Sequence, residues 1–113
     1  MNIQIFGTSK CFETKKAQRY FKERGVKCQM IDLKEKGFSM GELNAVLRAV
    51  GGLEQLINPN CKDQEALALI TYINPEAKID KLFENQQVIT TPVVRNGGKA
   101  TVGFKPEVWK TWT

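Results

Sequence analysis

Two hydrophobic periodicities alternate at the start of the chain, and this alternation limits the folds that it can adopt. Residues 3–6 form a short apolar run that is typical of a buried strand. Apolar residues within 11–24 recur at helical spacing, and Gly25 follows as a left-handed helix stop. Residues 26–32 then alternate as a second strand does. A strand–helix–strand unit predicts two parallel strands joined by a right-handed crossover.

A block of helices is predicted in the middle of the chain. Ser39 and Glu42 are spaced as a capping box and predict the start of a helix, which should end at Gly51-Gly52. Two further helical patterns meet at Asn74-Pro75, because proline ends one helix and suits the first turn of the next. The helix that starts at Pro75 should direct three apolar residues toward the core: Ile79, Leu82 and Phe83.

The chain favours β structure after Glu84. Residues 88–94 are rich in β-branched side chains, and Asn96-Gly97-Gly98 is a strong hairpin signal before a return strand at 100–103. A short helix should follow and pack three side chains against the sheet: Val108, Trp109 and Trp112. The predicted fold is therefore α/β, a four-stranded mixed sheet with helices on its faces, in the order β-α-β, helices, β-β-α.

The length and charge of the chain bound its organisation. With 113 residues it has the size of one domain, so we expect residues 1–113 to form a single unit with 39–84 as its helical insertion. It shows no signal peptide and no apolar run long enough to span a membrane, which predicts a cytoplasmic protein without a membrane partner. The net charge of +5 permits an anionic substrate or an acidic partner. Its lysines are scattered without interleaved aromatic residues, so we expect no nucleic-acid binding.

The absence of histidine excludes a Cys-His nucleophilic pair, a histidine base and nearly all zinc hydrolase sites. The three cysteines, Cys11, Cys28 and Cys61, are an odd and scattered set, so they predict neither a disulfide framework nor a metal site. Cys28 shares a strand face with Val26 and Met30, and we expect it in the core.

Cys11 lies at the junction of the first predicted strand and helix. Free backbone N–H groups and the helix dipole at a helix N-terminus favour an anion, so they lower the pKa of a thiol there. Lys10 on one side and Lys15 on the other should act in the same direction, although a solvated surface role is the alternative for each lysine. Cys11 is accordingly expected to be either an exposed thiolate nucleophile or a small inert residue in the first turn.

The order of elements, with a cysteine before the first helix and Thr91-Pro92 before the third strand, resembles the thioredoxin fold. Residues 7–17 and 91–107 are similar to the ArsC/Spx/YffB group, the arsenate reductases and their relatives, and the resemblance runs through the whole chain. It implies that Cys11 is the catalytic thiolate and that Pro92 is in a cis bond facing it. It also implies that Thr91 backbone groups face a bound thiol or peptide, and that glutathione and glutaredoxin act as reductants.

Three positions depart from the arsenate reductases, which place arginines around the oxyanion. Thr91 replaces the arginine of the usual Arg-Pro pair, Asn58 replaces a second arginine, and Lys105 stands where a third is expected. Arginine holds an oxyanion with a two-pronged fork, whereas lysine supplies a point charge. The resemblance therefore implies weaker oxyanion binding here, at roughly 1.5–3 kcal/mol for each lost hydrogen bond to a charged group.

The Spx regulators in the same group carry a Cys-x-x-Cys pair and bind RNA polymerase. This chain has Thr14 at the second position, so Cys11 is in a monothiol arrangement that cannot form a disulfide within the motif. We expect the Thr14 hydroxyl either to hydrogen-bond the Cys11 thiolate or to be an ordinary first-turn residue. Cys61 is expected to be a plain loop cysteine; a remote resolving thiol is the alternative, because the nearby position 58 lines the site in relatives.

Three functions follow from these residues. The favoured one is a monothiol, glutathione-linked thiol oxidoreductase that uses Cys11, with no bound cofactor and with glutathione or a glutaredoxin-like protein as its reducing partner. The second is a non-enzymatic, Spx-like regulator or adaptor that binds RNA polymerase or another protein, through a surface such as the Gly51-Gly52 turn. The third is a weak arsenate reductase in which Lys105 and Lys10 replace the arginines.

Overall fold

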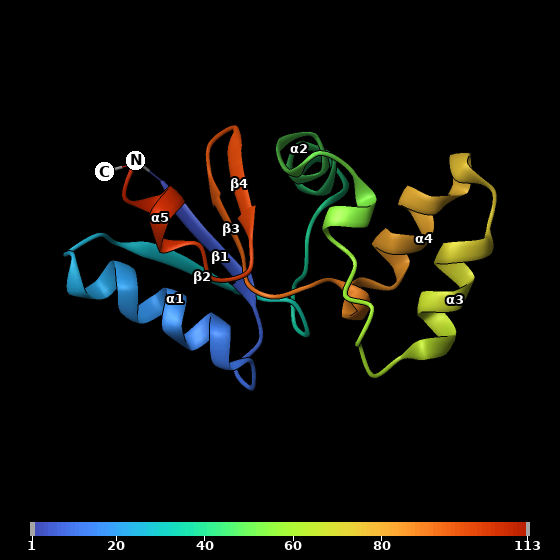
Figure 1. Ribbon diagram of the computed structural model, residues 1–113, viewed down its shortest axis with the longest axis horizontal. Helices are drawn as coiled ribbons and strands as arrows, with labels where there is room; N and C mark the ends of the chain where they lie inside the picture. The colour runs from blue at the N-terminus through green and yellow to red at the C-terminus, as the bar shows by residue number, and fades with distance from the viewer. Residues whose placement is uncertain (1, 113) are drawn as a thin grey trace.

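A computed structural model describes residues 2–112 of the chain (Figure 1). Its centre is a four-stranded sheet in the order β2-β1-β3-β4, built from β1 (Ile3–Gly7), β2 (Cys28–Asp32), β3 (Val93–Asn96) and β4 (Lys99–Val102). β1 pairs in parallel with β2 and antiparallel with β3, and β3 and β4 form an antiparallel hairpin. The predicted four-stranded mixed sheet of a thioredoxin-like fold is confirmed.

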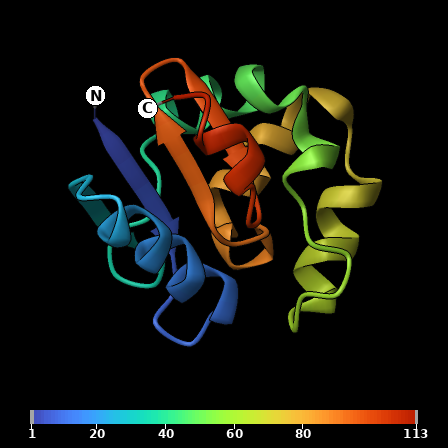
Figure 2. The same cartoon turned by 60° about the vertical axis from the view of Figure 1, so that its left-hand side comes forward.

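Helices cover both faces of this sheet. α1 (Phe12–Glu23) and α5 (Pro106–Trp109) cover one face, and α2 (Met40–Val50) packs on the other beside β4 (Figures 1 and 2). The segment between β2 and β3 also contains five shorter elements: η1 (Leu53–Gln55), α3 (Gln64–Tyr72), η2 (Pro75–Ala77), α4 (Lys78–Glu84) and η3 (Gln86–Val88). α3 and α4 pack against each other at the end of the molecule that is farthest from α1.

The core on the α1 side is built around Trp109. This side chain is fully buried, and its ring lies close to the rings of Tyr20, Phe21 and Phe104. The indole N–H donates to Thr101 Oγ1 at 2.8 Å, so the one polar atom of the side chain is satisfied. The prediction that the last helix packs down on the sheet is confirmed.

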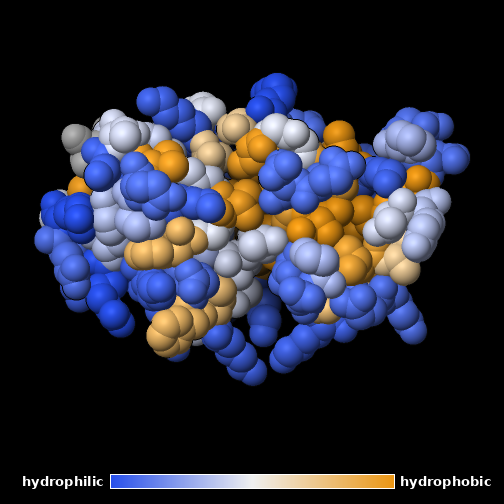
Figure 3. Space-filling view, viewed as in Figure 1, coloured by the Kyte–Doolittle hydropathy of each residue, from blue (hydrophilic) through white to orange (hydrophobic). Residues whose placement is uncertain are grey.

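The second core lies on the opposite face and joins the helical segment to the sheet. Phe6 and Phe38 stack with their ring centroids 4.0 Å apart, among buried residues of α2, α3 and α4. Partly buried apolar side chains extend this core outward, and Figure 3 shows hydrophobic residues gathered over α2, η1 and α3. Because this core is continuous, it holds the helical segment in place beside the sheet.

The predicted ends of α2 are confirmed. Ser39 Oγ accepts a hydrogen bond from the Glu42 N–H, and the Glu42 carboxylate accepts one from the Ser39 N–H, which completes the capping box. The helix ends at Gly51 with φ +92°, a left-handed conformation that glycine adopts without a Cβ clash. Within residues 2–112, no helix is long and apolar enough to cross a membrane.

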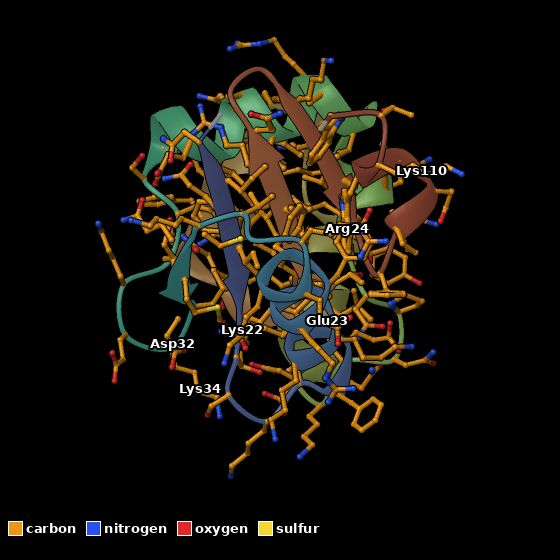
Figure 4. All side chains as sticks on the ribbon, turned by 90° about the vertical axis from the view of Figure 1, so that its left-hand side faces the viewer. Lys22, Glu23, Arg24, Asp32, Lys34 and Lys110 are labelled. Carbon is orange, nitrogen blue, oxygen red and sulfur yellow. The ribbon has the colours of Figure 1, made fainter. Side chains whose placement is uncertain are left out.

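The prediction that Cys28 and Met30 share a buried strand face is wrong. Cys28 is half-buried and Met30 is 36% exposed. β2 is an edge strand with a neighbour on one side only, and its buried residue is Ile31, whose side chain lies on the other face. Figure 4 shows Asp32 and Lys34 on the outside of the fold at the end of this strand.

One prediction about the second half of the chain is wrong. Of the α4 residues, Leu82 is fully buried, whereas Ile79 and Phe83 are more than a third exposed, because this short helix packs mainly on α3. The third strand begins at Val93, directly after Thr91-Pro92 as predicted, so only the last residues of the β-rich stretch 88–94 are strand. A 3-10 turn and the cis Thr91–Pro92 bond precede it. Proline has no N–H for a sheet ladder, which fits a place just before the strand.

Candidate functional site

Cys11 is the N-cap residue of α1. β1 ends at Gly7, and the chain turns so that the Cys11 N–H donates to the Thr8 carbonyl at 3.1 Å. Cys11 itself is extended, with φ −81° and ψ 117°, and its carbonyl accepts from the Lys15 N–H at the start of the helix. Its sulfur therefore lies at the positive end of the α1 dipole, where an anion is favoured.

Thr91, in the segment before β3, hydrogen-bonds the sulfur of Cys11 at the start of α1. Its hydroxyl donates to Cys11 Sγ at 3.0 Å, and the Cys11 thiol donates to the Thr91 carbonyl at 3.6 Å. Thr91 is followed by the buried Pro92, whose carbonyl accepts from the Gly103 N–H at 2.8 Å. These contacts join α1 to the segment before β3 through the nucleophile itself. The Thr91 hydroxyl is a site group that the sequence reasoning missed, since it considered only the backbone of this residue.

Thr14 lies beneath the cysteine and is 1% exposed. Among the described residues, its hydroxyl has no hydrogen-bond partner of standard geometry, but it is close enough to the Cys11 sulfur to lower the pKa of that thiol. A buried hydroxyl without a partner is costly, so one that is retained beside a nucleophile is a donor held for the ionised form. Thr14 therefore has the position for the first of its two predicted roles, a hydrogen bond to the thiolate.

Gly7 makes room for Thr14. A Cβ placed on Gly7 would lie 2.6 Å from Thr14 Cγ2 and 3.0 Å from Thr14 Cβ, closer than side-chain atoms can approach. Any larger residue at the end of β1 would thus displace the threonine under the sulfur. No role was predicted for Gly7. Its position, at the end of a buried strand and just before the turn to the cysteine, was the sequence signal that could have indicated one.

The surroundings of Cys11 lower the pKa of its thiol. Partial burial alone would raise this pKa, but hydrogen bonds from the side chains of Thr14 and Thr91 and from the N–H groups of Thr14 and Glu13 together outweigh it. Hydrogen bonds and helix-end N–H groups stabilise the charged sulfur, whereas burial destabilises it. The sulfur is thus a better nucleophile near neutral pH than an ordinary cysteine.

The other two cysteines have different surroundings. Burial raises the pKa of the Cys28 thiol, which lines a separate cavity of about 400 Å³ between β2 and the end of α1. Cys61 is buried, and its thiol donates to the Asp63 carbonyl at 3.5 Å. The surroundings of Cys11 and Cys28 thus shift the pKa of the two thiols in opposite directions.

A cavity of about 830 Å³ opens in front of Cys11. Its walls come from the turn before α1, the loop after β2, the turn between η1 and α3, and the segment from Phe83 to Thr91. The cavity therefore lies between the sheet and the helical segment, with the nucleophile on the sheet side.

The structure brings together some of the predicted site residues and separates others. Four of them line the cavity with Cys11, namely Lys10, Asn58, Cys61 and Thr91. Lys15 is exposed on α1 and Lys105 is exposed at the N-cap of α5, and neither lines the cavity. The role predicted for Lys105, that of an oxyanion-binding arginine, therefore stays a prediction that its place outside the cavity lining does not support.

The charges around the cavity are mixed. Its four lysines are accompanied by three carboxylates, and Asn58 and Thr91 contribute neutral side chains. Asn58 Oδ1 accepts from the Asn60 N–H at 2.9 Å, which fixes the turn. In the part of the chain that the structure describes, no three metal-ligating side chains are grouped to hold an ion.

A cysteine at the start of the first helix, next to a cis Thr-Pro bond on a four-stranded mixed sheet, defines a thioredoxin-like thiol protein. The glutaredoxin-like NrdH-redoxin from Escherichia coli shares this fold, with a TM-score of 0.52 at 18% identity over 100% of this chain and 96% of its own. Within this class the chain belongs to the ArsC family, whose family model matches residues 6–112.

The chain is similar to proteins named as transcriptional regulators and to proteins named as arsenate reductases. The global transcriptional regulator Spx 2 from Oceanobacillus iheyensis is 26% identical over 106 residues, which cover 92% of this chain and 78% of the regulator. The arsenate reductase from Vibrio cholerae superposes with a TM-score of 0.80 at 22% identity, over 96% of this chain and 94% of its own. The chain is thus similar to both a reductase and a regulator.

Proposed function

We propose that this protein is a monothiol, glutathione-linked thiol oxidoreductase. The observation that carries the proposal is the hydrogen bond of 3.0 Å from the Thr91 hydroxyl to Cys11 Sγ, at the N-terminus of α1. A regulator that used its fold only as a binding surface would have no need for a thiol whose pKa is lowered.

The proposed reaction is thiol–disulfide exchange. The Cys11 thiolate attacks one sulfur of a substrate disulfide, a Cys11–S–S–substrate bond forms, and the old S–S bond breaks with its electron pair on the departing thiolate. A glutathione-class thiolate then attacks the Cys11 sulfur, which releases the substrate as its thiolate and leaves Cys11 in a mixed disulfide with the small thiol. A second thiolate of this class attacks the small-thiol sulfur of that disulfide, which returns Cys11 to the thiolate and forms the disulfide of the small thiol. Glutathione, or a glutaredoxin-like protein, is the reductant in this scheme.

The positions of the other thiols favour a monothiol cycle. Thr14 occupies the place where a second motif cysteine would stand, and Cys28 lines the other cavity. Cys61 lines the same cavity as Cys11, but it is buried and its thiol donates a hydrogen bond to the Asp63 carbonyl. These contacts support a structural role for Cys61 over the role of a resolving thiol. An external thiol is therefore the resolving group in the proposal.

Arsenate is the less favoured substrate. Tetrahedral dianions are held by arginine forks, whereas Thr91 and Asn58 contribute neutral groups and the lysines of the cavity are accompanied by carboxylates. A neutral disulfide needs no such charge, so thiol exchange fits these residues better than oxyanion reduction does.

The test is the pH dependence of alkylation at each cysteine, followed by mass-mapped peptides. Cys11 should titrate below the ordinary thiol value of 9.0, and Cys28 should titrate above it. A glutathione-coupled assay with a mixed-disulfide substrate should then show turnover by the native chain and none by Cys11→Ser. A Cys11 that titrates at or above the ordinary value, or equal turnover by the variant, would contradict the proposal.

A second candidate is a protein-binding regulator, favoured by the similarity to the transcriptional regulator Spx 2. In that case RNA polymerase or another protein is the partner, and the cavity in front of Cys11 is not used for turnover. Cys11→Ser separates the two candidates, because a regulator of this kind keeps its binding without the thiol.

A further inference from the structure

Phe12 is the residue directly after the nucleophile, and its side chain is 74% exposed. It is the first residue of α1, where the Cα–Cβ bond tilts toward the helix N-terminus. Its ring is therefore carried toward the same end of the helix as the Cys11 sulfur. A single exposed aromatic residue on a surface is common, so its neighbours decide whether it has a role.

The cavity in front of Cys11 also has apolar residues among the charged and polar residues of its lining. Leu33, Phe83 and Ile89 line the cavity in front of Cys11, and Phe83 is 37% exposed. Cys11 thus directly precedes an exposed aromatic residue and itself lines a hollow that is partly lined with hydrophobic side chains. A substrate whose sulfur is bonded to Cys11 must place the atoms next to that sulfur against one or both of these surfaces.

We infer that the substrate is a protein or peptide disulfide in which a bulky apolar residue adjoins the reacting cysteine, and that Phe12 selects it by packing against that residue. The inference rests on the thiol-exchange function proposed above and names its substrate class. Aromatic side chains are enriched at recognition surfaces because they bury a large apolar area with few rotatable bonds. Glutathione disulfide has only a glycine and a γ-linked glutamate beside its cysteine, so it offers Phe12 no such contact.

The reaction step is the same for any substrate of this class. The Cys11 thiolate attacks the substrate cysteine sulfur, the Cys11–S–S–substrate bond forms, and the leaving thiolate departs with the electron pair of the old disulfide. Phe12 takes no part in bond making. It contributes to binding and to the orientation of the disulfide, so its removal should lower the rate for apolar substrates only.

Two short peptides test the inference directly. Each carries one cysteine as a mixed disulfide with a chromogenic aromatic thiol, flanked by leucine in one peptide and by serine in the other. The aromatic thiol is the better leaving group because its pKa is lower, so attack falls on the peptide sulfur and releases colour without any added reductant. The release is followed under single-turnover conditions with the full chain.

We expect the native chain to react about tenfold faster with the leucine peptide, a ratio that corresponds to ~1.4 kcal/mol. Phe12→Ala should reduce this ratio to about one, whereas Phe12→Leu should keep most of it. Tyr72→Ala is the matched control, since Tyr72 is 86% exposed on α3 and should leave the ratio unchanged. Both aromatic residues are exposed, so neither substitution should unfold the protein.

The outcomes separate the inference from the function beneath it. Equal rates with the two peptides in the native chain, or a ratio that survives in Phe12→Ala, would overturn the role of Phe12 while leaving thiol exchange intact. A native chain that reacts no faster than Cys11→Ser with either peptide would overturn both.

Discussion

Thr91 and Cys11, which are 80 residues apart in the sequence, exchange hydrogen bonds: the threonine hydroxyl donates to the sulfur at 3.0 Å, and the thiol donates to the threonine carbonyl at 3.6 Å. The two bonds respond differently to ionisation. Loss of the thiol proton removes the second bond, while the first becomes a hydrogen bond to a charged acceptor and grows stronger. Of these two bonds, the one from the hydroxyl is therefore the one that favours the thiolate.

Thr91→Val should raise the pKa of Cys11, because valine has the shape of threonine without its donor. A hydrogen bond to a charged group contributes about 1.5–3 kcal/mol, so its loss should produce a clear upward shift of the Cys11 pKa. The measurement is the pH dependence of Cys11 alkylation. Thr90→Val is the control, since Thr90 is the preceding residue and its N–H bonds to Leu56 rather than to the site. An unchanged Cys11 pKa in Thr91→Val would show that the hydroxyl bond does not favour the thiolate.

Gly7→Ala should destabilise the fold by about 1–3 kcal/mol, the usual effect of overpacking. The added Cβ would collide with the Thr14 side chain. The double variant Gly7→Ala, Thr14→Ala should recover much of the lost stability, because alanine lacks Oγ1 and Cγ2, the two Thr14 atoms nearest the added Cβ. Urea denaturation of the native chain, the single variants Gly7→Ala and Thr14→Ala, and the double variant gives the coupling energy between the two positions. Additive effects would mean that the glycine is needed for another reason.

The contribution of Cys11 to stability should increase with pH. Its pKa is lowered in the folded state, so between the folded pKa and the ordinary value of 9.0 the unfolded chain binds more protons than the folded one. The contribution is complete above 9.0 and is lost as the pH falls through the folded pKa. The difference in the free energy of unfolding between the native chain and Cys11→Ser should therefore grow as the pH rises toward that value.

The contribution of Cys28 to stability should instead decrease as the pH rises, so Cys28→Ser is the comparison for the Cys11→Ser measurements. Burial raises the pKa of Cys28, so its neutral thiol is fully tolerated below 9.0 and the folded state loses stability as the pH rises above it. Urea denaturation over the pH range measures both differences. Parallel curves for the two variants would contradict the opposite pKa shifts.

Thr101→Val should destabilise the protein by about 1–3 kcal/mol, because it leaves the buried indole N–H of Trp109 without an acceptor. Thr111→Val is the control, since Thr111 is exposed near the end of the chain. Cys11 alkylation should be unaffected in both variants, because Thr101 and Trp109 lie outside the cavity in front of Cys11. If Thr101→Val lost no more stability than Thr111→Val, the indole N–H of Trp109 would have found another acceptor, and the prediction would be wrong.

Local signals in the sequence account for the elements that were predicted well. The capping box at Ser39 and Glu42 and the glycine stop at Gly51 act within one helix, so their residues lie next to each other in the chain and in the fold. The same holds for Cys11 at the start of α1. The exposed face of β2 was not predictable in this way, because a strand pattern does not say whether the strand lies at the edge of its sheet.

The contacts within the site depend on tertiary packing, which is why much of the site was not predicted. Thr91 and Cys11 meet only after the chain has folded around the sheet, and the fit of Gly7 under Thr14 is a matter of atomic spacing. Lys105 follows the family position in the sequence, yet the structure places it at α5 and outside the cavity lining. A motif gives the order of residues, whereas the cavity depends on how four separate segments come together.

The separation of Thr91 and Cys11 also affects the timing of reactivity during synthesis. A ribosome makes Cys11 early and Thr91 80 residues later, so a nascent chain carries this thiol through those residues without the Thr91 hydrogen bond. Until the segment before β3 docks, the sulfur should react slowly, as an ordinary thiol does near neutral pH. Activation would then coincide with completion of the sheet, and unfinished chains would be spared premature oxidation.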